Sequence, residues 1–393
     1  MPRNTKIILP IIVISQFFCT SLWFAGNGVI NDIVTTFNLK DNALGHLTSA
    51  VQFGFIIGTL IFAILTIVDR FSPSKVFFTS AFFGALLNLG VLWDHNNITS
   101  LLSMRFFTGF FLAGIYPVGM KIAADYYKDN LGKSLGFLVG ALVLGTAFPH
   151  LLKNVTGYYS WKYTILTTSI LAFLGGLIML LFVPNGPFRK PSQKTNLFAF
   201  FKVFHQKEFR SAAFGYFGHM WELYAFWAFV PVILKQYSLQ QELSLNISLW
   251  SFIIIATGSI ACIFSGYISK LIGIKRTAFI ALFLSCLCCI ISPLILGSNN
   301  EILFLSFLIF WAFVVIADSP LLSTLVAQNA PVKLKGTALT IVNCIGFSIT
   351  IISIQYITSL TNILDSNKIY MVLAIGPVLG LISLRKRQKI VRK

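Results

Sequence analysis

Residues Ile98 to Tyr127 read ITSLLSMRFFTGFFLAGIYPVGMKIAADYY, a long apolar run that contains an arginine. As a helix, about 27 residues rise ~40 Å, which is enough to cross a ~30 Å hydrocarbon layer with some tilt. Arg105 would then lie below the membrane interface, where a cation costs at least ~2.5 to 3.5 kcal/mol on insertion scales. We therefore expect Arg105 to face other helices or a water-filled cavity, and to serve either structural pairing or substrate contact.

Helical periodicity assigns different roles to the two cations of this run. At 100° per residue, Tyr116 shares a face with Arg105, whereas Lys121 falls about 160° away. Tyr116 thereby joins Arg105 as a predicted substrate-binding residue. We expect Lys121 to extend toward the membrane surface and to pair with Asp125 one turn further on.

The composition excludes an ordinary soluble domain. Of the 393 residues, 56% are hydrophobic and 11% are charged, which is typical of a polytopic membrane protein. The net charge of +18 does not indicate nucleic-acid binding, because the Lys and Arg residues lie in short gaps between apolar runs. The six cysteines fall inside apolar runs without metal-type spacing, so we expect small buried side chains and no cofactor.

Windows of about 20 apolar residues predict twelve transmembrane helices. The windows are residues 7–31, 43–68, 75–93, 98–125, 131–153, 161–184, 210–235, 243–268, 275–297, 301–328, 335–357 and 367–384. In this arrangement 23 Lys and Arg fall on the side of the termini, five fall on the other side, and two lie within the fourth span. This excess predicts that both termini are cytoplasmic, and we expect a multi-pass protein of a bacterial inner membrane.

The longest gap between windows, residues 185–209, divides the spans six and six. Its Pro and Lys content indicates a cytoplasmic linker, and its part NLFAFFKVF, residues 196–204, predicts a short helix on the anionic membrane surface. The predicted domains are therefore an N-terminal six-helix bundle at 1–184 and a C-terminal six-helix bundle at 210–393. The second bundle ends in the basic tail RKRQKIVRK.

The first span carries a polar stripe. Gln16, Thr20, Trp23 and Asn27 recur at i, i+4, i+7 and i+11 on an otherwise apolar helix. Such a stripe is expected to face water or substrate, so Gln16, Trp23 and Asn27 are predicted substrate-binding residues. The alternative is hydrogen bonding between helices, to which polar side chains in membrane spans contribute ~0.6 to 2 kcal/mol each.

Glu222 is an intramembrane carboxylate close to the middle of the seventh span, GYFGHMWELYAFWAFVP. His219 lies one turn before it, on nearly the same helix face. A buried carboxyl beside an imidazole can carry a proton, so we predict that the two residues form a proton-coupling site. A structural ion pair is the alternative.

The tenth span contains the sequence IADSP, in which Pro320 interrupts the helix two residues after Asp318. Proline frees backbone groups that neighbours or water must satisfy, which is common where a helix lines a cavity. We predict that Asp318 takes part in proton coupling and that Trp311, on the same face, binds substrate. The alternative for Asp318 is a kink capped by its carboxylate. Asn343 lies on a weaker polar stripe of the eleventh span and is a further predicted substrate-binding residue.

Two basic loops share one pattern and lie six spans apart. Between spans two and three, LTIVDRFSPSK resembles the motif G-x-x-x-D-R-x-G-R-x-K/R, and its matching residues are Asp69, Arg70 and Lys75. Between spans eight and nine, GYISKLIGIKR repeats the pattern with Gly266, Gly273, Lys275 and Arg276, and Lys270 replaces the acid. A loop motif that repeats after six spans implies two homologous halves.

These two loops, with an R-x-x-x-G element at Arg105 and Gly109, resemble the major facilitator superfamily. The resemblance implies an all-α membrane protein with twelve transmembrane helices in two pseudo-symmetric six-helix bundles. It further implies that the bundles rock about a central site lined by spans one, four, seven and ten. The seven matching loop residues would act as gating residues on the cytoplasmic side.

The resemblance implies a secondary active transporter. An enzyme is not expected, because the five His residues are scattered without catalytic or metal spacing. A cavity with Arg105 opposite Glu222 and Asp318 suits a small polar organic solute or organic anion that moves with a proton, and we expect a monomer. The alternative is a proton-driven efflux pump for hydrophobic drugs or metabolites, which the aromatic content favours.

Overall fold

The computed structural model describes residues 5–385 apart from 41, 128–130, 158–159, 190–202, 332–333, 362 and 364–366, and all regular structure within them is helical. The helices of the first half are α1 (Thr5–Thr20), α2 (Ala25–Gly28), α3 (Ile30–Thr36), α4 (Ala43–Ile64), α5 (Ile67–Arg70), α6 (Pro73–Gly90), α7 (Ile98–Leu112), α8 (Tyr116–Tyr126), α9 (Leu131–Val155) and α10 (Lys162–Phe182). Those of the second half are α12 (Lys207–Gln240), α13 (Ile247–Ile272), α14 (Ile274–Leu296), α15 (Glu301–Ala317), α16 (Ser319–Asn329), α17 (Lys335–Leu360), the 3-10 helix η2 (Ile369–Ala374) and α18 (Ile375–Arg385).

The described helices overlap each of the twelve predicted windows, and the predicted all-α membrane fold is confirmed, whereas the count of twelve spanning helices stays a prediction. In the described part of the chain, nine helices are long and apolar enough to cross a membrane. Shorter apolar helices cover Ile7–Thr20 and Ile369–Arg385, and the 18 residues of α6 occupy the remaining window. The six cysteines are all buried and free of disulfides, as predicted.

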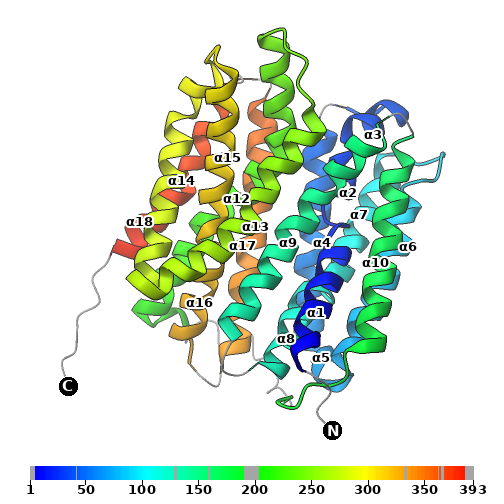
Figure 1. The fold of residues 1–393 in the computed structure, drawn as a ribbon, viewed down its shortest axis with the longest axis vertical. Helices are drawn as coiled ribbons and strands as arrows, with labels where there is room; N and C mark the ends of the chain where they lie inside the picture. The colour runs from blue at the N-terminus through cyan, green and yellow to red at the C-terminus, as the bar shows by residue number, and fades with distance from the viewer. Residues whose placement is uncertain are drawn as a thin grey trace.

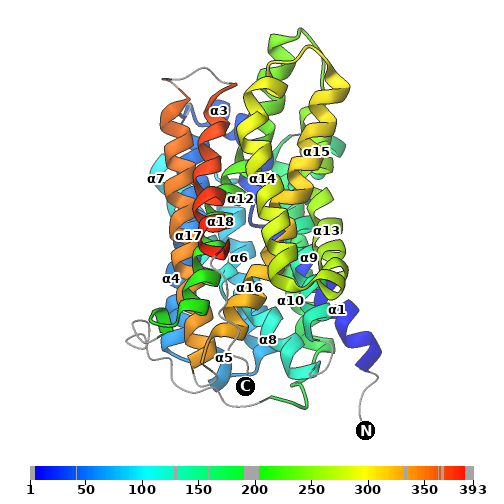
Figure 2. The same ribbon diagram turned by 90° about the vertical axis from the view of Figure 1, so that its left-hand side faces the viewer.

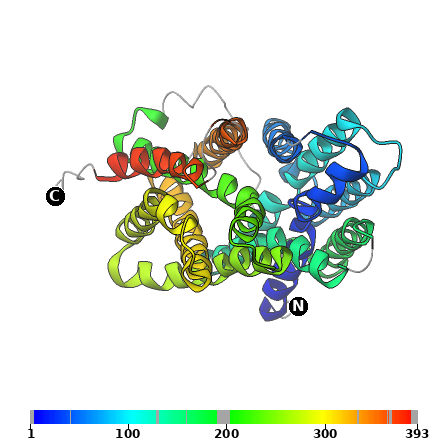
Figure 3. The ribbon, with the colours of Figure 1, turned by 90° about the horizontal axis from the view of Figure 1, so that it is seen from above.

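The helices form two groups that lie side by side (Figures 1 and 3). In one group α4 packs on α7 and α10 packs on α6 and α1, and in the other α12 packs on α17 and α18. Two seams join the groups, one between α9 and α13 and the other between α4 and α17. The predicted domain boundaries stay a prediction, because residues 190–202 of the linker and 386–393 of the basic tail lie outside the described residues.

The molecule has a lower and an upper end in the view of Figure 1. The lower end is the one at which α1 begins and α5 lies, and the upper end is the one at which α3 lies and α15 begins (Figures 1 and 2). Helix α4 therefore descends from the upper to the lower end. Helix α17 rises from the lower to the upper end, so the two helices of this seam run antiparallel.

Three of the four spans expected around a central site are broken near their middle. The first span breaks at residues 21–24 between α1 and α2, the fourth at 113–115 between α7 and α8, and the tenth at Asp318 between α15 and α16. Prolines in the first turn of α8 and of α16 mark two of these breaks. The seventh span, by contrast, continues through Pro231 as one helix, α12. A break frees backbone carbonyls inside the membrane, and these need partners.

Candidate functional site

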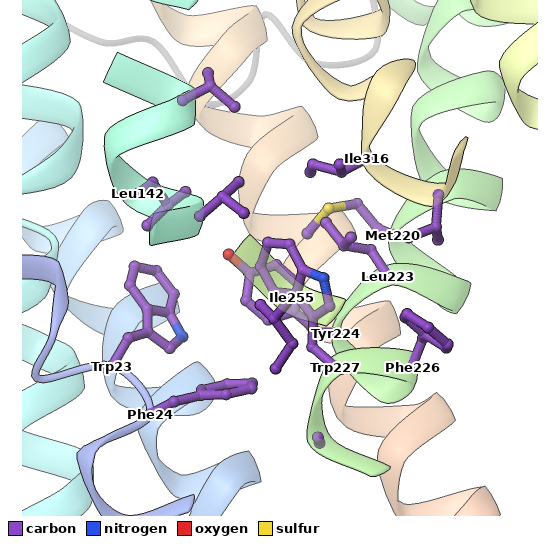
Figure 4. Close-up of a cluster of buried hydrophobic side chains, with 14 of the residues drawn as sticks. Trp23, Phe24, Leu142, Met220, Leu223, Tyr224, Phe226, Trp227, Ile255 and Ile316 are labelled. Carbon is purple, nitrogen blue, oxygen red and sulfur yellow. The ribbon is translucent and has the colours of Figure 1, made fainter. Parts of the chain in front are cut away.

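An aromatic cluster from both halves occupies the centre of the interface between them. The ring of Trp23, in the break after α1, lies 4.9 Å from Phe55 of α4 and 5.7 Å from Phe347 of α17, measured between centroids. Tyr224 of α12 lies 5.8 Å from Trp23 and 5.3 Å from Phe347. Figure 4 shows Trp23 on one side of the interface and Tyr224 with Trp227 on the other. Trp23 is thus a predicted substrate-binding residue with a central position.

A cavity of about 560 Å³ lies directly below this aromatic cluster. Its polar lining residues include Thr59, Thr66, Asp69, Lys121, Thr340 and Asn343. Thr59 lies one helical turn below Phe55 on α4, and Asn343 lies one turn below Phe347 on α17. The walls of the cavity thus come from both halves, and the aromatic cluster lies about one helical turn above them. We call this cluster the roof, although its four rings are not among the described residues that line the cavity.

Above the aromatic cluster the two halves are in direct contact. On the α4–α17 seam, Gln355 Nε2 donates a hydrogen bond of 2.8 Å to Ser49 Oγ. On the α9–α13 seam, Asn246 Nδ2 donates a hydrogen bond of 2.6 Å to Asn154 Oδ1. Both contacts lie toward the upper end, so the cavity faces the lower end and the upper end is closed.

Arg105 of α7 is buried inside the first half and binds the break of the first span. Its Nη2 atom donates hydrogen bonds to the carbonyl oxygens of Leu22 and Trp23, at 3.1 and 2.6 Å. Its Nη1 atom donates to Asn88 Oδ1 at 3.1 Å, and Asn88 donates in turn to Ser169 of α10. The structural alternative is thus the one observed in this conformation. A role of Arg105 in substrate contact stays a prediction.

His219 pairs with Asp318 and not with Glu222, which corrects the predicted contact. The His219 Nδ1 atom lies 2.8 Å from Asp318 Oδ1, and both side chains are 1% exposed. Asp318 occupies the N-cap position of α16 but accepts no hydrogen bond from the helix backbone there, so the capped kink is not observed. The pair therefore ties α12 to the break in the tenth span.

Glu222 is fully buried within the second half, between α12, α14 and α15. Its carboxylate accepts hydrogen bonds from Ser285 Oγ at 2.5 Å, Trp311 Nε1 at 2.6 Å and Cys289 Sγ at 3.2 Å. All three donors are neutral, so the ion-pair alternative for Glu222 is not observed. The Trp311 indole, predicted on the Asp318 side as a substrate contact, binds Glu222 in this conformation.

Two residues of the polar stripe take part in packing within the first half. Gln16 is fully buried, and its Oε1 atom packs against Gly119 of α8, where a Cβ atom would clash with it. Asn27 Nδ2 donates a hydrogen bond of 2.8 Å to Thr48 Oγ1 of α4. The alternative of hydrogen bonding between helices is therefore observed for Asn27. The amide atoms of Gln16 have no hydrogen-bond partner among the described residues, and substrate contact stays a prediction for both residues.

Tyr116 and Asn343 lie closer to the interface between the halves. Asn343 is partly exposed and lines the cavity. Tyr116, in the first turn of α8, is partly buried and lies near Tyr216 and Tyr224 of α12. Among the predicted substrate-binding residues, the structure thus brings Trp23, Tyr116 and Asn343 toward the interface.

The first basic loop carries an ion pair within one half. Lys121 Nζ of α8 lies 3.0 Å from Asp69 Oδ1, and the two side chains are 27% and 17% exposed. This contact corrects the expected pairing of Lys121 with Asp125. Both residues of the pair line the cavity, so the loop borders its lower mouth.

Other residues of this loop are held by the end of the sixth span or lie at the surface. Arg189 Nη2 donates hydrogen bonds of 2.9 and 2.8 Å to the carbonyl oxygens of Asp69 and Phe71. Arg70 and Lys75 are exposed, and Arg70 Nε donates to Thr66 Oγ1 at 3.2 Å. Their gating role stays a prediction.

The second basic loop joins α13 to α14 at the lower end. Gly273 has a φ of +90°, a backbone conformation that favours glycine. Lys275 and Arg276 follow in the first turn of α14. Gly266 lines a second cavity of about 630 Å³ between α9, α13 and α16. The gating role of these four residues also stays a prediction.

Four residues of the site, Phe55, Phe347, Thr59 and Asn88, were not predicted from the sequence. Asn88 lies alone within the apolar third window. The two phenylalanines are inconspicuous because the chain has 39. A sequence signal that could identify such residues is an aromatic and a polar residue spaced one helical turn apart, on two helices that face each other. The pairs Phe55 with Thr59 and Asn343 with Phe347 both have this spacing.

With this geometry in view, comparison with known proteins defines the class. The family model of the Major Facilitator Superfamily matches residues 12–354, and the chain belongs to this family. The expected class, a transporter and not an enzyme, is thereby confirmed.

Two solved structures share the fold over nearly the whole chain. One is a bacterial homologue of the human lysosomal transporter Spinster in an inward-facing, unoccupied conformation, with a TM-score of 0.69, 13% identity and coverage of 98% of this chain and 94% of that one. The other is a mutant form of the nucleoside transporter NupG, with a TM-score of 0.73, 15% identity and coverage of 97% and 99%.

A curated relative matches over part of the chain. The sphingosine-1-phosphate transporter SPNS2 of Xenopus tropicalis is 24% identical over 173 residues, which are 40% of this chain and 31% of that protein. The chain thus matches about a third of the length of this relative.

Proposed function

We propose that this transporter moves a small polar organic solute or organic anion by alternating access, with coupling to protons. The observation that carries the proposal is the cavity of about 560 Å³ beneath the aromatic cluster. Phe55 and Phe347, from opposite halves, form the roof of this cavity, and the halves touch above them. Rocking of the halves would separate the two rings of this roof, close the lower mouth and expose the same region to the upper end.

Solute recognition is assigned to the cavity and its roof. Thr59, Thr340 and Asn343 offer hydrogen-bonding groups, and Lys121 offers a cation to an organic anion that replaces Asp69 as its partner. Arg105, Glu222 and Asp318 have no part in this assignment, because they are not among the described residues that line the cavity. Efflux of hydrophobic compounds is the second candidate, and the four aromatic rings of Trp23, Phe55, Tyr224 and Phe347 favour it.

Proton coupling is assigned to His219 and Asp318. Both groups are titratable, lie 2.8 Å apart and are almost fully buried. Asp318 lies two residues before Pro320, which lines the second cavity near the lower end. Protonation of either partner changes the charge of the pair. Because Asp318 lies directly before α16, a shift of this helix would transmit the change to the wall of the second cavity.

The lower end is proposed to be cytoplasmic, in a bacterial inner membrane, with the protein acting as a monomer. Support comes from the basic loops, because Arg70, Lys75, Lys270 and Arg276 all lie at this end. An excess of Lys and Arg in short loops is characteristic of the cytoplasmic side.

A flux assay tests the proposal. The purified chain is reconstituted into proteoliposomes, a pH difference is imposed, and uptake is measured for a panel of radiolabelled organic acids, neutral polar solutes and hydrophobic cations. We expect one polar or anionic solute to accumulate, and a protonophore to abolish the accumulation. Accumulation of hydrophobic cations alone would favour the efflux candidate, and absence of pH-driven movement across the whole panel would contradict proton coupling.

A further inference from the structure

The second cavity lies beside the proposed solute path, on the seam between α9 and α13. It measures about 630 Å³. Its lining includes Phe137 of α9, Ile263 and Tyr267 of α13, and Leu321 of α16. Residues of both halves therefore form its walls, although the proposed function assigns it no role in solute binding.

The α9–α13 seam is tight above this cavity and open at it. A Cβ atom on Gly140 of α9 would lie 3.4 Å from the carbonyl oxygen of Ser259, and one on Gly258 would lie 3.1 Å from Val143 Cγ1. One turn below Gly140, a Cβ atom on Gly136 would meet no atom of the described residues within 4 Å, and the same holds for Gly266 on α13. The two helices thus separate toward the lower end and leave a gap between the halves.

The gap opens toward the membrane. Helix α13 is one of the apolar spans, and its residues Ile263 and Tyr267, which line the cavity, are 39% and 60% exposed. The neighbouring side chain of Phe264 is 52% exposed. Exposed apolar side chains on a membrane span face hydrocarbon, so an acyl chain in the bilayer has direct access to the gap.

A basic rim borders the same cavity at the lower end. Lys270, in the last turn of α13, lines the cavity, and its Nζ atom lies 5.7 Å from the centroid of the Tyr267 ring. Arg276 follows in the first turn of α14 and is exposed. Lys270 stands where the repeated loop motif carries an acid, so this chain has a cation at the place where the gap meets the membrane surface.

We propose that this cavity is a binding site for an anionic phospholipid of the surrounding bilayer. One acyl chain enters the gap between Gly136 and Gly266, and the headgroup phosphate contacts Lys270. The apolar walls match the chain and the basic rim matches the charge, which is the combination that recognises anionic lipid headgroups between membrane helices. Because the gap must close when the halves rock, the bound lipid favours the conformation that is open at the lower end.

Native mass spectrometry of the full chain, with phosphatidylglycerol and phosphatidylcholine of identical acyl chains, tests the site. We expect the wild type to retain one phosphatidylglycerol in preference to phosphatidylcholine. Gly266→Leu fills open space and should abolish this retained lipid. Lys270→Gln should lower the preference about fivefold, since one Lys near an anionic headgroup contributes ~1 kcal/mol.

Gly336→Leu is the matched control, because Gly336 is also open to a Cβ atom but lines the cavity beneath the aromatic cluster. This variant should retain the lipid as the wild type does. Equal retention by Gly266→Leu and wild type, or equal preference in Lys270→Gln and wild type, would overturn the proposal. An excess of inorganic phosphate that displaced the lipid fully would show that a free anion, and not a lipid, is the ligand. None of these outcomes depends on the transported solute.

Discussion

The rings of Phe55 and Phe347 lie 4.5 Å apart, one from each half of the chain, and roof the cavity beneath them. Each phenylalanine is followed toward the lower end by a polar cavity residue, Thr59 on α4 and Asn343 on α17. The two helices run antiparallel. The residue four positions after Phe55 on α4 and the residue four positions before Phe347 on α17 therefore both lie one turn below the rings. The roof is therefore an interaction that the halves make in this conformation, and in the proposed alternating-access cycle we expect it to be lost when the upper end opens.

Phe347→Ala is expected to shift the protein away from the lower-open conformation. The substitution removes ring contacts with Phe55, Trp23 and Tyr224, and truncation of a buried Phe costs ~3 to 5 kcal/mol in well-packed cores. Some of this free energy comes from contacts between the halves. Each ~1.4 kcal/mol lost there shifts the equilibrium between the lower-open and upper-open conformations about tenfold. Labelling of an Asn343→Cys reporter from the lower side should decrease.

Phe304→Ala provides the control for this experiment. Phe304 stacks on Tyr237 with a centroid distance of 3.6 Å, and both residues belong to the second half. The variant should unfold at a lower temperature and leave the labelling of Asn343→Cys unchanged. Equal labelling in the two variants would show that the roof does not distinguish the conformations.

Arg105→Ala is expected to lower thermal stability in the absence of any solute. It leaves the carbonyl groups of Leu22 and Trp23 and the amide oxygen of Asn88 without this donor, and each unpaired buried acceptor costs ~1 to 3 kcal/mol. Lys121→Ala should be much milder, because its partly exposed ion pair is worth ~0 to 1 kcal/mol. Melting curves in detergent measure both effects. An Arg105→Ala protein as stable as the wild type, but unable to bind solute, would restore the role of Arg105 in substrate contact.

The fold could be predicted from the sequence because hydropathy and loop motifs are local signals. A span needs only about 20 apolar residues, and the lipid environment forces its backbone into a helix. The breaks were harder to predict. Pro320 marks the break at Asp318. The break at residues 21–24 has the sequence SLWF, which contains no Pro or Gly. Arg105 stabilises that break from a distant helix, and no local pattern contains this contact.

The site was predicted as residue types but not as contacts. His219 and Glu222 lie one turn apart on α12, yet His219 contacts Asp318 whereas Glu222 contacts Ser285 and Trp311. A difference of about 60° around one helix selects different neighbours, and the rotation of α12 against α14, α15 and α16 decides which. That rotation follows from side-chain packing across the bundle. It is not encoded in the periodicity of any single span.

Asp69→Asn and Lys121→Gln are expected to change access to the cavity in opposite directions. If Asp69 binds the second half when the lower mouth closes, Asp69→Asn weakens that closure and should raise labelling of Asn343→Cys. Lys121→Gln releases Asp69 from its partner at 3.0 Å, leaves it available to the second half and should lower the labelling. Changes of the same sign in both variants, or no change in either, would show that Asp69 acts only within its own half.

Asp318→Asn and His219→Gln are expected to abolish accumulation driven by a pH difference while preserving counterflow exchange of solute. Asn and Gln keep nearly the same shape but remove the titration of one partner, so the protein can still alternate with solute bound and loses its response to the proton gradient.

Glu222→Gln is the contrasting variant. Its carboxylate accepts three hydrogen bonds. A Gln amide keeps these contacts only if its NH₂ donates to Ser285 Oγ and its oxygen accepts from Trp311 and Cys289, and hydrogen bonds to a neutral amide are weaker than those to a carboxylate. That variant should be less stable, by ~1 to 3 kcal/mol, and remain coupled. Uptake and exchange in the same proteoliposomes separate the two classes. If Glu222→Gln lost pH-driven accumulation with normal exchange while Asp318→Asn kept it, the coupling site would be Glu222 and not the pair formed by His219 and Asp318.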